Sequence, residues 1–404
     1  MAKPSLLMLL SRHPVAERSG RAVMLRQRIE QAKLRFEPTL VVFGSPVGDA
    51  RDEGLQFVPM ASPASIGLNA FRLSSLPLQA WLYFSECARA RIESLRSSCK
   101  ASAVYVDMLR LAPLVTPTPE GVSLIVDFDD LLSQRYAAAG SGYEVMGFLS
   151  AKFGPFAGIA RAFSAPLLRA EAIRCARYEQ VLLARADLSL FTSPKEAARA
   201  RLGKNVRAAP PLAAPKVDLP WQTTPGERLI FLGNLHYAEN LRMLRLLADA
   251  MAALERDGAA PGDAVIEVVG DHLPDLPQAF DPKRFRFRGH VANLNELAGA
   301  GIFLAPVVGG SGVKVKILDG MALGCPVVAT PMACEGLDVR ANRDLLVASS
   351  ARDVLTCAVA LRARPRLRQM LSQRALRYLQ RVHAPEVGVR IADAMAATLS
   401  QETL

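Results

Sequence analysis

Residues 309–331, GGSGVKVKILDGMALGCPVVATP, place a glycine-rich loop, a helix with one acidic residue and a short apolar strand in direct succession. The preceding run 301–307 is apolar and uncharged, as expected of a parallel strand covered on both faces. Glycines let backbone N–H groups approach a ligand closely, and a helix N-terminus favours an anion. Lys314 and Lys316 add positive charge to a first turn where the helix dipole disfavours it. The stretch therefore predicts a phosphate-binding loop, formed by Gly310, Ser311, Gly312, Val313 and Lys314.

The helix that follows the loop carries a second group suited to a nucleotide. Ser311 is placed to cap a helix that starts near Val313. Asp319 lies seven residues after Gly312, nearly two turns along and on about the same face. We expect its carboxylate to accept hydrogen bonds from ribose hydroxyls. A glycine-rich turn with a purely structural role is the alternative.

The segment from Gly310 to Thr330 resembles the nucleotide-sugar signature of GT-B glycosyltransferases, especially the retaining family usually numbered four, the glycosyl transferases group 1. In this chain Asp319 stands in place of the second glutamate of the family's paired-acid motif, and Ser311 in place of the first. The resemblance implies a nucleotide diphosphate sugar as donor, no cofactor, and transfer with retention of anomeric configuration. It also implies a role in the synthesis of bacterial surface polysaccharides or glycolipids.

Two further segments extend the resemblance through the second half of the chain. Residues 229–235 resemble the strand and glycine turn that open the family's second domain, which adds Gly233 and Asn234 to the expected donor site. Many family members have a basic pair there; this chain has Asn234 and Glu239, so Lys314 and Lys316 would supply the positive charge. Residues 285–291 resemble the strand and loop that receive the nucleotide base, which implies base contacts from Gly289, His290 and Val291. For His290, an exposed loop position is the alternative.

Strands and helices alternate along the whole chain, and prolines crowd residues 208–227. This pattern predicts an α/β protein with two doubly wound domains and a linker between them. We place an acceptor-binding Rossmann-like domain at 1–215, a nucleotide-sugar-binding Rossmann-like domain at 216–380, and a C-terminal helix at 381–404. The resemblance to GT-B proteins implies that the domains face one another across a cleft and that the last helix crosses back to the first domain.

In the first half, residues 124–133 read as a buried strand that ends in three neighbouring carboxylates. Ligands bind at strand ends in open α/β sheets, and crowded carboxylates tend to have one raised pKa, which suits a general base. Asp127, Asp130 and Ser133 match an Asp-x-x-Asp-x-x-Ser stretch that some related polysaccharide transferases carry. We therefore predict Asp127 and Asp130 as catalytic residues. Alternatively, Asp129 or Asp130 caps the following helix.

The loop after the first strand occupies the place where GT-B enzymes have a glycine turn that lines the cleft. Its candidate residues for contacting the acceptor or the cleft are His13, Arg18, Gly20 and Arg21. Either arginine could contact a diphosphate.

The net charge of +11 points to an anionic partner, and residues 1–35 hold eight basic and two acidic residues. Aromatic residues make up only 6% and no nucleic-acid-binding motif is present, so a membrane surface is favoured over nucleic acid. The apolar segment 145–168 supports a contact with the lipid interface, although core packing or an acceptor-pocket wall explains it equally. Six cysteines without a pairing framework indicate reduced thiols in a cytoplasmic protein, with a peripheral position on the inner face of the membrane as the alternative. Dispersed histidines disfavour a zinc site.

Together these features predict a metal-independent glycosyltransferase, of the hexosyltransferase type, that moves a sugar to a carbohydrate or lipid-linked acceptor. The literal Asp-x-Asp spacing of Asp127 and Asp129 keeps a metal site open. Two other classes remain. A non-catalytic GT-B homologue that acts as a binding or scaffold protein would explain the departures from the motif. A nicotinamide-dependent enzyme is disfavoured, because no G-x-G-x-x-G turn follows the first strand.

Overall fold

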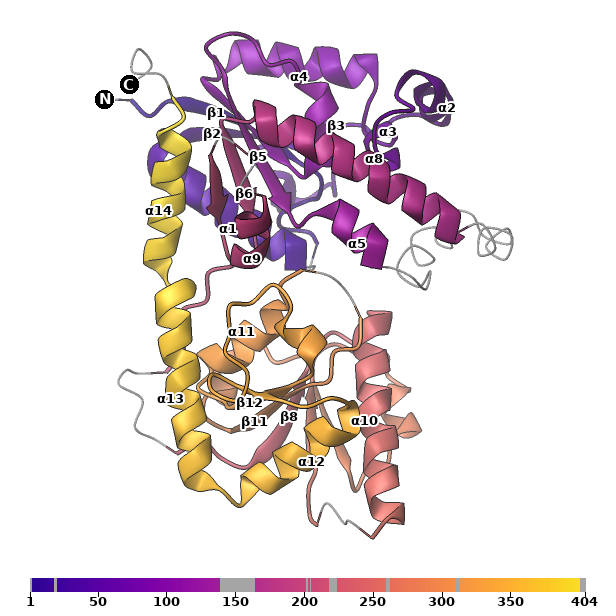
Figure 1. Cartoon of the computed structure of the whole chain (residues 1–404), viewed down its shortest axis with the longest axis vertical. Helices are drawn as coiled ribbons and strands as arrows, with labels where there is room; N and C mark the ends of the chain where they lie inside the picture. Colours follow the sequence, from indigo (N-terminus) through magenta and orange to yellow (C-terminus); the bar gives the residue numbers. More distant parts are fainter. Residues whose placement is uncertain are drawn as a thin grey trace. The chain divides into compact units, whose positions relative to one another are not determined.

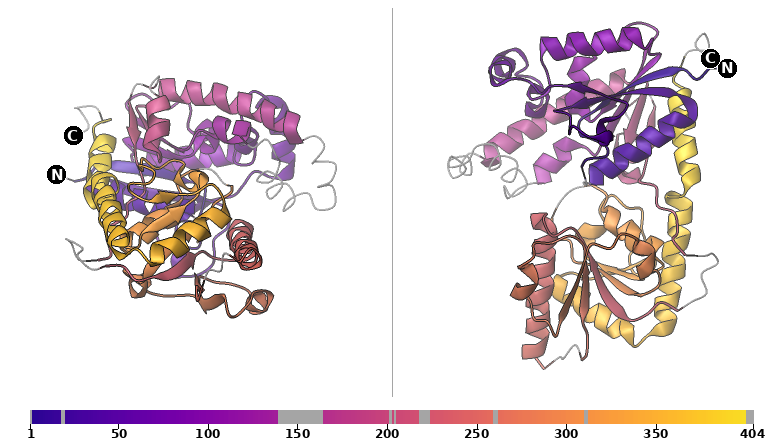
Figure 2. Two further views of the ribbon diagram at one scale, coloured as in Figure 1. Left: turned by 60° about the horizontal axis from the view of Figure 1, so that its bottom comes forward. Right: turned by 180° about the vertical axis from the view of Figure 1, so that it is seen from behind.

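The computed structural model describes residues 2–17, 20–138, 164–200, 203, 205–217, 224–258, 262–309 and 312–399 (Figures 1 and 2). The chain forms two compact units, unit 1 from residues 1–210 and 386–404 and unit 2 from residues 211–385. Each unit is built on a parallel sheet with helices on both faces. The two doubly wound, Rossmann-like units predicted from the sequence are thus confirmed.

In unit 1, the described residues form a seven-stranded sheet in the order β3-β2-β1-β4-β5-β6-β7, and every neighbouring pair is parallel. The order reverses at β1, which pairs with β2 on one side and β4 on the other. Such a reversal creates the crevice where ligands bind in doubly wound sheets. The strands are β1 Ser5–Leu10, β2 Glu37–Phe43, β3 Leu55–Val58, β4 Ala103–Asp107, β5 Ser123–Asp129, β6 Leu188–Phe191 and β7 Val206–Ala208.

The helices of unit 1 cover both faces of this sheet. They are α1 Gly20–Arg35, α2 Pro63–Arg72, α3 Leu78–Trp81, α4 Glu86–Ser98, α5 Leu132–Ala138, α8 Ser164–Arg185 and α9 Pro194–Arg199, with the 3-10 turns η1 Ala50–Asp52 and η2 Leu109–Leu114. The last helix, α14 Pro385–Ala396, also packs in unit 1 from residue 386 onward. Arg35 pairs with Asp393 at 2.7 Å, and the Ser123 hydroxyl donates to the carbonyl of Thr398 at 2.7 Å.

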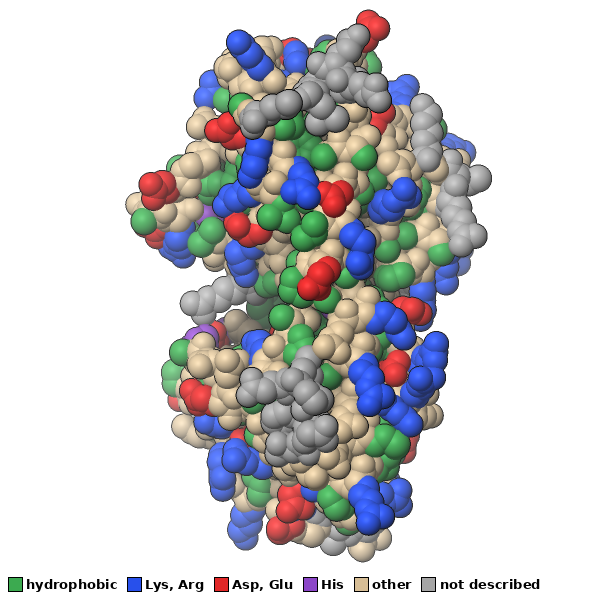
Figure 3. All heavy atoms as spheres, turned by 90° about the vertical axis from the view of Figure 1, so that its left-hand side faces the viewer, with side chains coloured by type: hydrophobic (Ala, Val, Ile, Leu, Met, Phe, Trp, Pro, Cys, Tyr) green, Lys and Arg blue, Asp and Glu red, His purple; other side chains and the backbone are tan. Residues whose placement is uncertain are grey.

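Most of the basic side chains of residues 1–35 have partners within unit 1. Five of the eight pair with acidic side chains, and two of those five, Arg21 and Arg28, lie inside the unit. Lys3 and Arg26 donate to backbone carbonyls. Arg18 lies outside the described residues. On the face that carries α14, blue side chains of lysine and arginine and red side chains of aspartate and glutamate both lie at the surface (Figure 3).

In unit 2, the described residues form a six-stranded parallel sheet in the order β10-β9-β8-β11-β12-β13, which reverses at β8. The strands are β8 Arg228–Leu232, β9 Ile266–Val269, β10 Phe285–Gly289, β11 Gly301–Ala305, β12 Val327–Ala329 and β13 Leu346–Val347. The helices are α10 Ala238–Arg256, α11 Val315–Ala322, α12 Ala351–Arg362 and α13 Pro365–Val382, with the 3-10 turns η4 Leu276–Ala279, η5 Leu294–Leu297 and η6 Pro331–Cys334.

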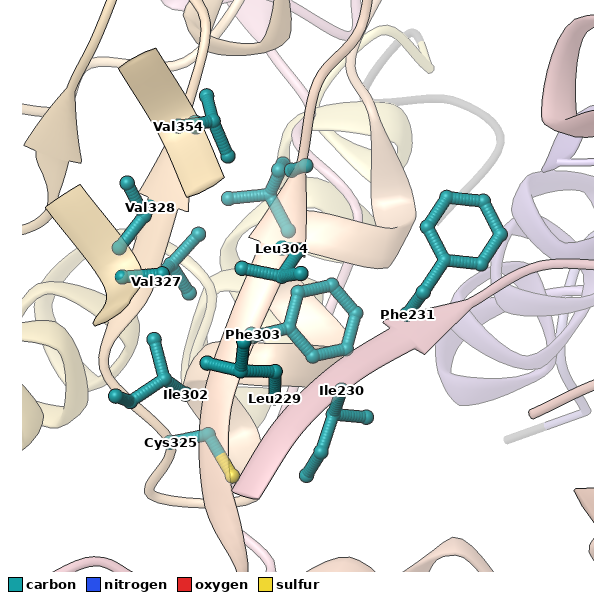
Figure 4. Packing of buried hydrophobic residues seen from close by; sticks show 14 of the residues in the cluster. Leu229, Ile230, Phe231, Ile302, Phe303, Leu304, Cys325, Val327, Val328 and Val354 are labelled. Atoms are coloured by element: carbon teal, nitrogen blue, oxygen red, sulfur yellow. The ribbon is translucent and has the colours of Figure 1, made fainter. Parts of the chain in front are cut away.

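The central strands of unit 2 are apolar because both faces of the sheet are covered. Ile230 on β8 and Phe303 on β11 are fully buried in one cluster (Figure 4). Gly320 on α11 lies directly against the ring of Phe303, where an added Cβ would come within 2.7 Å of the ring. This close approach fixes the height of α11 above the sheet and hence the position of the loop that precedes it.

The described residues of the proline-rich segment after β7, 209–217 and 224–227, contain neither helix nor strand. Residues 145–163 of the expected lipid-contact segment lie outside the described residues, and 164–168 begin α8. In the part of the chain that the structure describes, no helix has both the length and the apolarity needed to cross a bilayer.

Candidate functional site

The carboxyl ends of β8, β9, β10 and β11 lie along one edge of the unit 2 sheet, since all four strands are parallel. The residues that follow these ends are Gly233 and Asn234, Gly270 and Asp271, His290, and the loop 306–314. This edge is where ligands bind in open α/β sheets. The structure thus brings most of the described donor-site residues predicted from the sequence to one edge, whereas Asp319 lies further along α11.

The turns after β8 and β9 pack too closely for any side chain. A Cβ on Gly270, whose φ is +137°, would come within 2.2 Å of the carbonyl oxygen of Gly233. A Cβ on Gly233 would meet the side chain of Asn240 at 2.9 Å. Asn240, in the first turn of α10, donates from Nδ2 to the carbonyl of Asn234 at 2.8 Å. The N-terminus of α10 is therefore held against the end of β8.

Lys316, in the first turn of α11, reaches the same place. Its Nζ donates to Asn240 Oδ1 at 2.5 Å and lies 6.0 Å from the centre of the Phe231 ring. Burial lowers the pKa of the Lys316 ammonium to about 8, repulsion from Lys314 adds to the effect, and Glu239 partly opposes it. A buried cation beside a glycine-rich loop is suited to binding an anion.

Helix α11 does not start where the sequence predicted. The helix begins at Val315, two residues later than expected, and Lys314 occupies the N-cap position without a capping side chain. Gly312 has φ +72°, which explains glycine there, and the Lys314 ammonium donates to its carbonyl at 3.0 Å. Glu239 Oε2 lies 3.4 Å from where a Cβ on Gly309 would stand. Gly310 and Ser311 lie outside the described residues, whereas Val313 packs against the core.

Asp319 lies one turn further along α11 than Lys316. Burial raises the pKa of its carboxyl group, and Lys216 opposes this effect. Among the described residues, no hydrogen bond to this carboxyl group occurs. A half-buried carboxyl group of this kind retains its capacity to bond hydroxyl groups of a ligand.

The loop after β10 is more open. Gly289 has φ +67° and its carbonyl accepts from the N–H of Gly270 at 2.9 Å. The side chain of His290 is 61% exposed, with Nδ1 3.3 Å from Asp271 Oδ1. Val291 packs partly against the core. The exposure of His290 is compatible with both interpretations, a base contact and an ordinary loop position.

In unit 1, the matching edge of the sheet carries a cluster of three aspartates around one arginine. Arg21 bonds Asp107 through Nε at 2.8 Å and through Nη2, and its guanidinium lies 3.4 Å from Asp127 and 3.1 Å from Asp129. Asp107 also accepts from the N–H of Ser11 at 2.8 Å. Because Arg21 is surrounded by carboxylates, it is not placed as a free diphosphate contact.

Asp127 does not have the raised pKa expected of a crowded general base. It is fully buried, and it accepts from Arg28 Nε at 2.9 Å and from the Tyr105 hydroxyl at 2.7 Å. Burial alone would raise the pKa of its carboxyl group, but Arg21 and Arg28 outweigh that effect and hold it near 2. The sequence did not reveal this, because Arg28 lies ninety-nine residues away.

The second carboxylate of the motif, Asp130, is also engaged. Arg135 donates to Asp130 Oδ2 from Nε at 3.0 Å and from Nη2. Ser133 of the same motif donates from its N–H and its hydroxyl to Glu179, at 3.0 and 2.5 Å. Glu179 on α8 thus binds the first turn of α5.

Glu196, in the first turn of α9, is a carboxyl group near this edge whose pKa is raised. Burial raises the pKa of Glu196 to about 7, and repulsion from Asp130 and Asp129 adds to this effect. A hydrogen bond from the N–H of Leu131 lowers the pKa and partly opposes the rise. The Oε2 of Glu196 and the hydroxyl of Ser193, the N-cap residue of α9, are buried and have no hydrogen-bond partner among the described residues. Sequence reasoning missed Glu196, although its place just after β6 on a sheet edge rich in acids was a usable signal.

The remaining predicted residue of the first loop is held by the protein itself. His13 accepts at Nδ1 from the N–H groups of Val15 and Ala16, at 3.2 and 3.0 Å, and its Nε2 lies 3.0 Å from Asp52. These contacts order the loop after β1. Gly20 is the first residue of α1.

Comparison with known sequences gives a match over part of the chain. Residues 226–362 match the family model of glycosyl transferases group 1. This range contains the four strand ends, Lys316 and Asp319. No curated protein sequence matches the chain significantly.

Solved structures match over nearly the whole chain. Sucrose-phosphate synthase from Thermosynechococcus elongatus has a TM-score of 0.64 at 15% identity and covers 97% of this chain and 98% of its own. Anabaena HepE in complex with UDP has a TM-score of 0.65 at 12% identity, with 97% and 100% covered. WaaG, a glycosyltransferase involved in lipopolysaccharide biosynthesis, has a TM-score of 0.56 at 14% identity, with 96% and 98% covered. The family match and the fold confirm the predicted resemblance: the chain is a GT-B protein similar to the group 1 glycosyltransferases.

Proposed function

We propose that this protein transfers a sugar, of the hexose type, from a nucleotide diphosphate sugar to a carbohydrate or lipid-linked acceptor, with retention of configuration. Bacterial surface polysaccharide or glycolipid synthesis is the role we assign to it. The observation that carries the proposal is Lys316, a buried cation at the strand-end edge that also bears a glycine-rich loop and Asp319, inside the group 1 match.

The donor half of the proposal follows from the chemistry of this edge. Lys316, Lys314 and the N–H groups at the start of α11 would bind the diphosphate and stabilise the charge that develops as the glycosidic bond breaks. Asp319 would bond the ribose hydroxyls, and the loop of Gly289, His290 and Val291 would contact the base. HepE has been solved with UDP and with UDP-glucose, so uridine diphosphate glucose is the first donor to test.

For unit 1, we propose an acceptor-binding role in which Asp127 and Asp130 act through their neighbours. Asp127 holds Arg21 and Arg28, and Asp130 holds Arg135. Asp129 is more accessible, and it accepts from the Thr192 hydroxyl at 2.7 Å. We propose that Asp129 and Glu196 contact the acceptor, because both lie at the carboxyl edge of the sheet and Glu196 has a pKa suited to moving a proton near neutral pH.

Metal independence is also part of the proposal. The Asp127-Phe128-Asp129 stretch has the spacing of a metal-binding motif. Arg21 lies near both carboxylates, which supports the interpretation that they bind this arginine and not a metal ion. Activity that falls in EDTA and returns with manganese would contradict this part alone. We further propose a cytoplasmic location, because all six cysteines are free thiols.

The first test is calorimetric titration with uridine, guanosine and adenosine diphosphate sugars, using the intact protein and Asp319→Ala. Saturable binding of one nucleotide class that weakens in the variant supports the proposal and identifies the donor. A folded protein that binds none of them favours the alternative, a GT-B homologue that binds or scaffolds without transferring sugar.

A further inference from the structure

Helix α2 of unit 1 buries a polar side chain and exposes its large apolar side chains, the reverse of an ordinary surface helix. Its one buried residue is the polar Asn69, whose Nδ2 donates to the carbonyls of Trp81 and Phe84 at 2.9 and 2.8 Å. Its large apolar side chains face outward, with Leu68 48% and Phe71 84% exposed. A helix that packs on a protein core normally buries its apolar stripe instead. Hydrogen bonds of Asn69 therefore attach α2 to residues 81–84.

The sequence around α2 lacks the charges that normally keep such a surface in water. Residues 58–85 contain one charged residue, Arg72, and no acid. Met60, just before the helix, is 37% exposed. Contiguous exposed apolar surface of this kind marks an interaction site.

Helix α8 also exposes apolar side chains. Its exposed side chains include the aliphatic Leu167, Ile173 and Val181, the basic Arg169, Arg177 and Arg185, and the uncharged Pro166, Gln180 and Ala184. Both acids of the helix are buried, since Glu171 accepts from the N–H of Leu78 at 2.6 Å and Glu179 binds Ser133. The described part of α8 therefore exposes positive charge without any negative charge.

Helix α3 connects the two helices. Its Trp81 accepts from Asn69 of α2 through its carbonyl, and the guanidinium of Arg174 on α8 lies 6.0 Å from the centre of its ring. Leu78 at the start of α3 is bonded to Glu171 of α8. We call the exposed residues of α2 and α8, with Met60, the α2–α8 surface.

We propose that the α2–α8 surface docks unit 1 on an anionic lipid bilayer. Apolar side chains would enter the boundary between headgroups and acyl chains, and the arginines of α8 would pair with headgroup phosphates. Charge complementarity selects this occupant: the described residues of 58–85 and of α8 expose arginines and no acid. The surface differs from both regions that the sequence suggested, residues 1–35 and 145–163. The inference is independent of the proposed sugar transfer, because binding to vesicles needs neither donor nor acceptor.

The test is co-sedimentation of the full chain with phosphatidylcholine vesicles, with and without about 30 mol% phosphatidylglycerol. We compare the intact protein with Leu68→Ser/Phe71→Ser and with Arg169→Gln/Arg177→Gln. The matched control is Val389→Ser/Arg390→Gln, a change of an exposed aliphatic and an exposed arginine on α14. Thermal melts followed by circular dichroism verify that each variant is folded, and all the substituted side chains are exposed.

We expect each variant of the α2–α8 surface to bind anionic vesicles roughly tenfold more weakly, and the control to bind as the intact protein does. The arginine variant should change binding to anionic vesicles only. Intact protein that does not bind anionic vesicles overturns the inference, as does unchanged binding of Leu68→Ser/Phe71→Ser. A lipid-free dimer that this variant dissociates, without vesicle binding, would assign the surface to a second copy of the chain and overturn it as well.

Discussion

Lys316 Nζ and Asn240 Oδ1 are joined by a 2.5 Å hydrogen bond that connects the first turn of α11 to the first turn of α10. Asn240 in turn donates to the carbonyl of Asn234 at the end of β8. The ammonium group of a lysine has three donors, and Asn240 takes one of them. The bond thus orients a buried cation at the carboxyl edge of the sheet while leaving donors for a ligand.

Removing the Lys316 charge should weaken donor binding. Lys316→Met keeps the stem against Phe231 but deletes the cation, and a hydrogen bond to a charged group contributes about 1.5–3 kcal/mol, or roughly tenfold to a hundredfold in affinity. Calorimetry with the donor measures the loss. Lys283→Met, at an exposed lysine of the same unit, is the control and should bind normally. Equal affinity of the two variants would remove Lys316 from the donor site.

Donor affinity should also fall as the pH rises above neutrality. The pKa of Lys316 in the free protein is about 8, lowered from 10.5, so its ammonium loses its proton well below the usual range of a lysine side chain. An anionic donor binds the protonated form, and binding is therefore strongest below pH 8 and declines as the pH passes 8. The check is the dissociation constant between pH 7 and 9. The decline should disappear in Lys316→Met, and a decline that persists there comes from another group.

In unit 2, the sequence predicted a local motif better than the contacts between distant residues. The glycine-rich loop, the helix after it and the next strand are contiguous, so their order alone predicted the succession of elements that carries Lys314 and Asp319. Asn240 was missed because its partner Lys316 lies seventy-six residues away. The helix start was misplaced because Lys314, rather than a capping side chain, occupies the N-cap position. Contacts across the sheet edge depend on packing that no short window of sequence contains.

Gly270→Ala should destabilise unit 2 strongly. Its φ of +137° disfavours any side chain, and an added Cβ would stand 2.2 Å from the carbonyl oxygen of Gly233, a backbone atom held by two strands. We expect a loss of at least about 3 kcal/mol in the free energy of unfolding. Gly262→Ala is the matched control, since its φ is +61° and nothing lies within 4 Å of the added atom; it should cost only about 1 kcal/mol. Urea denaturation distinguishes the two, and similar losses would show that strain alone, without the contact, sets the cost.

Asp127→Asn should lower the free energy of unfolding of unit 1. The substitution removes one of the carboxylates that neutralise the buried Arg21 and Arg28. Breaking a buried ion pair typically costs about 3–5 kcal/mol. Asp393→Asn is the control, because it breaks a half-exposed pair with Arg35, and such pairs contribute less than about 1 kcal/mol. Urea denaturation at pH 7 compares them. A loss for Asp127→Asn no larger than that of the control would mean that the arginines find other partners.

The same carboxylate predicts a stability change in acid. The pKa of Asp127 is held near 2 in the folded protein, below its usual 3.8, so the unfolded chain binds more protons in this window. The stabilisation is fully present above pH 3.8 and is lost as the pH falls through 2. It amounts to about 2 kcal/mol for this group. Asp127→Asn should therefore show a smaller fall in the free energy of unfolding between pH 5 and 2 than the intact protein, and parallel curves would contradict the assignment.

In unit 1, the sequence indicated the acidic edge of the sheet, but the raised pKa expected of one of its crowded carboxyl groups does not occur at Asp127. The strand ending in Asp127, Asp129 and Asp130 was correctly placed, because a run of apolar residues before acids is a local pattern. Whether an acid is held ionised or protonated depends on neighbours from other elements. Arg28 comes from α1 and lowers the pKa of Asp127, whereas Glu196 comes from α9 and is raised by burial.

Glu196 should make unit 1 less stable as the pH rises toward neutrality, which is the opposite of the pH effect expected from Asp127. Its pKa is raised from 4.5 to about 7 by burial and by Asp130 and Asp129, so the folded protein binds more protons than the unfolded chain between these values. Stability then decreases as the pH rises from 4.5 to 7, by an amount on the order of 2 kcal/mol. Glu196→Gln cannot ionise, and it should be more stable relative to the intact protein at pH 8 than at pH 5. Urea denaturation at both values measures this, with the exposed Glu53→Gln as control. If Glu196→Gln and the intact protein differ by the same amount at both pH values, Glu196 does not titrate in this range, and its proposed role in moving a proton for the acceptor loses its basis.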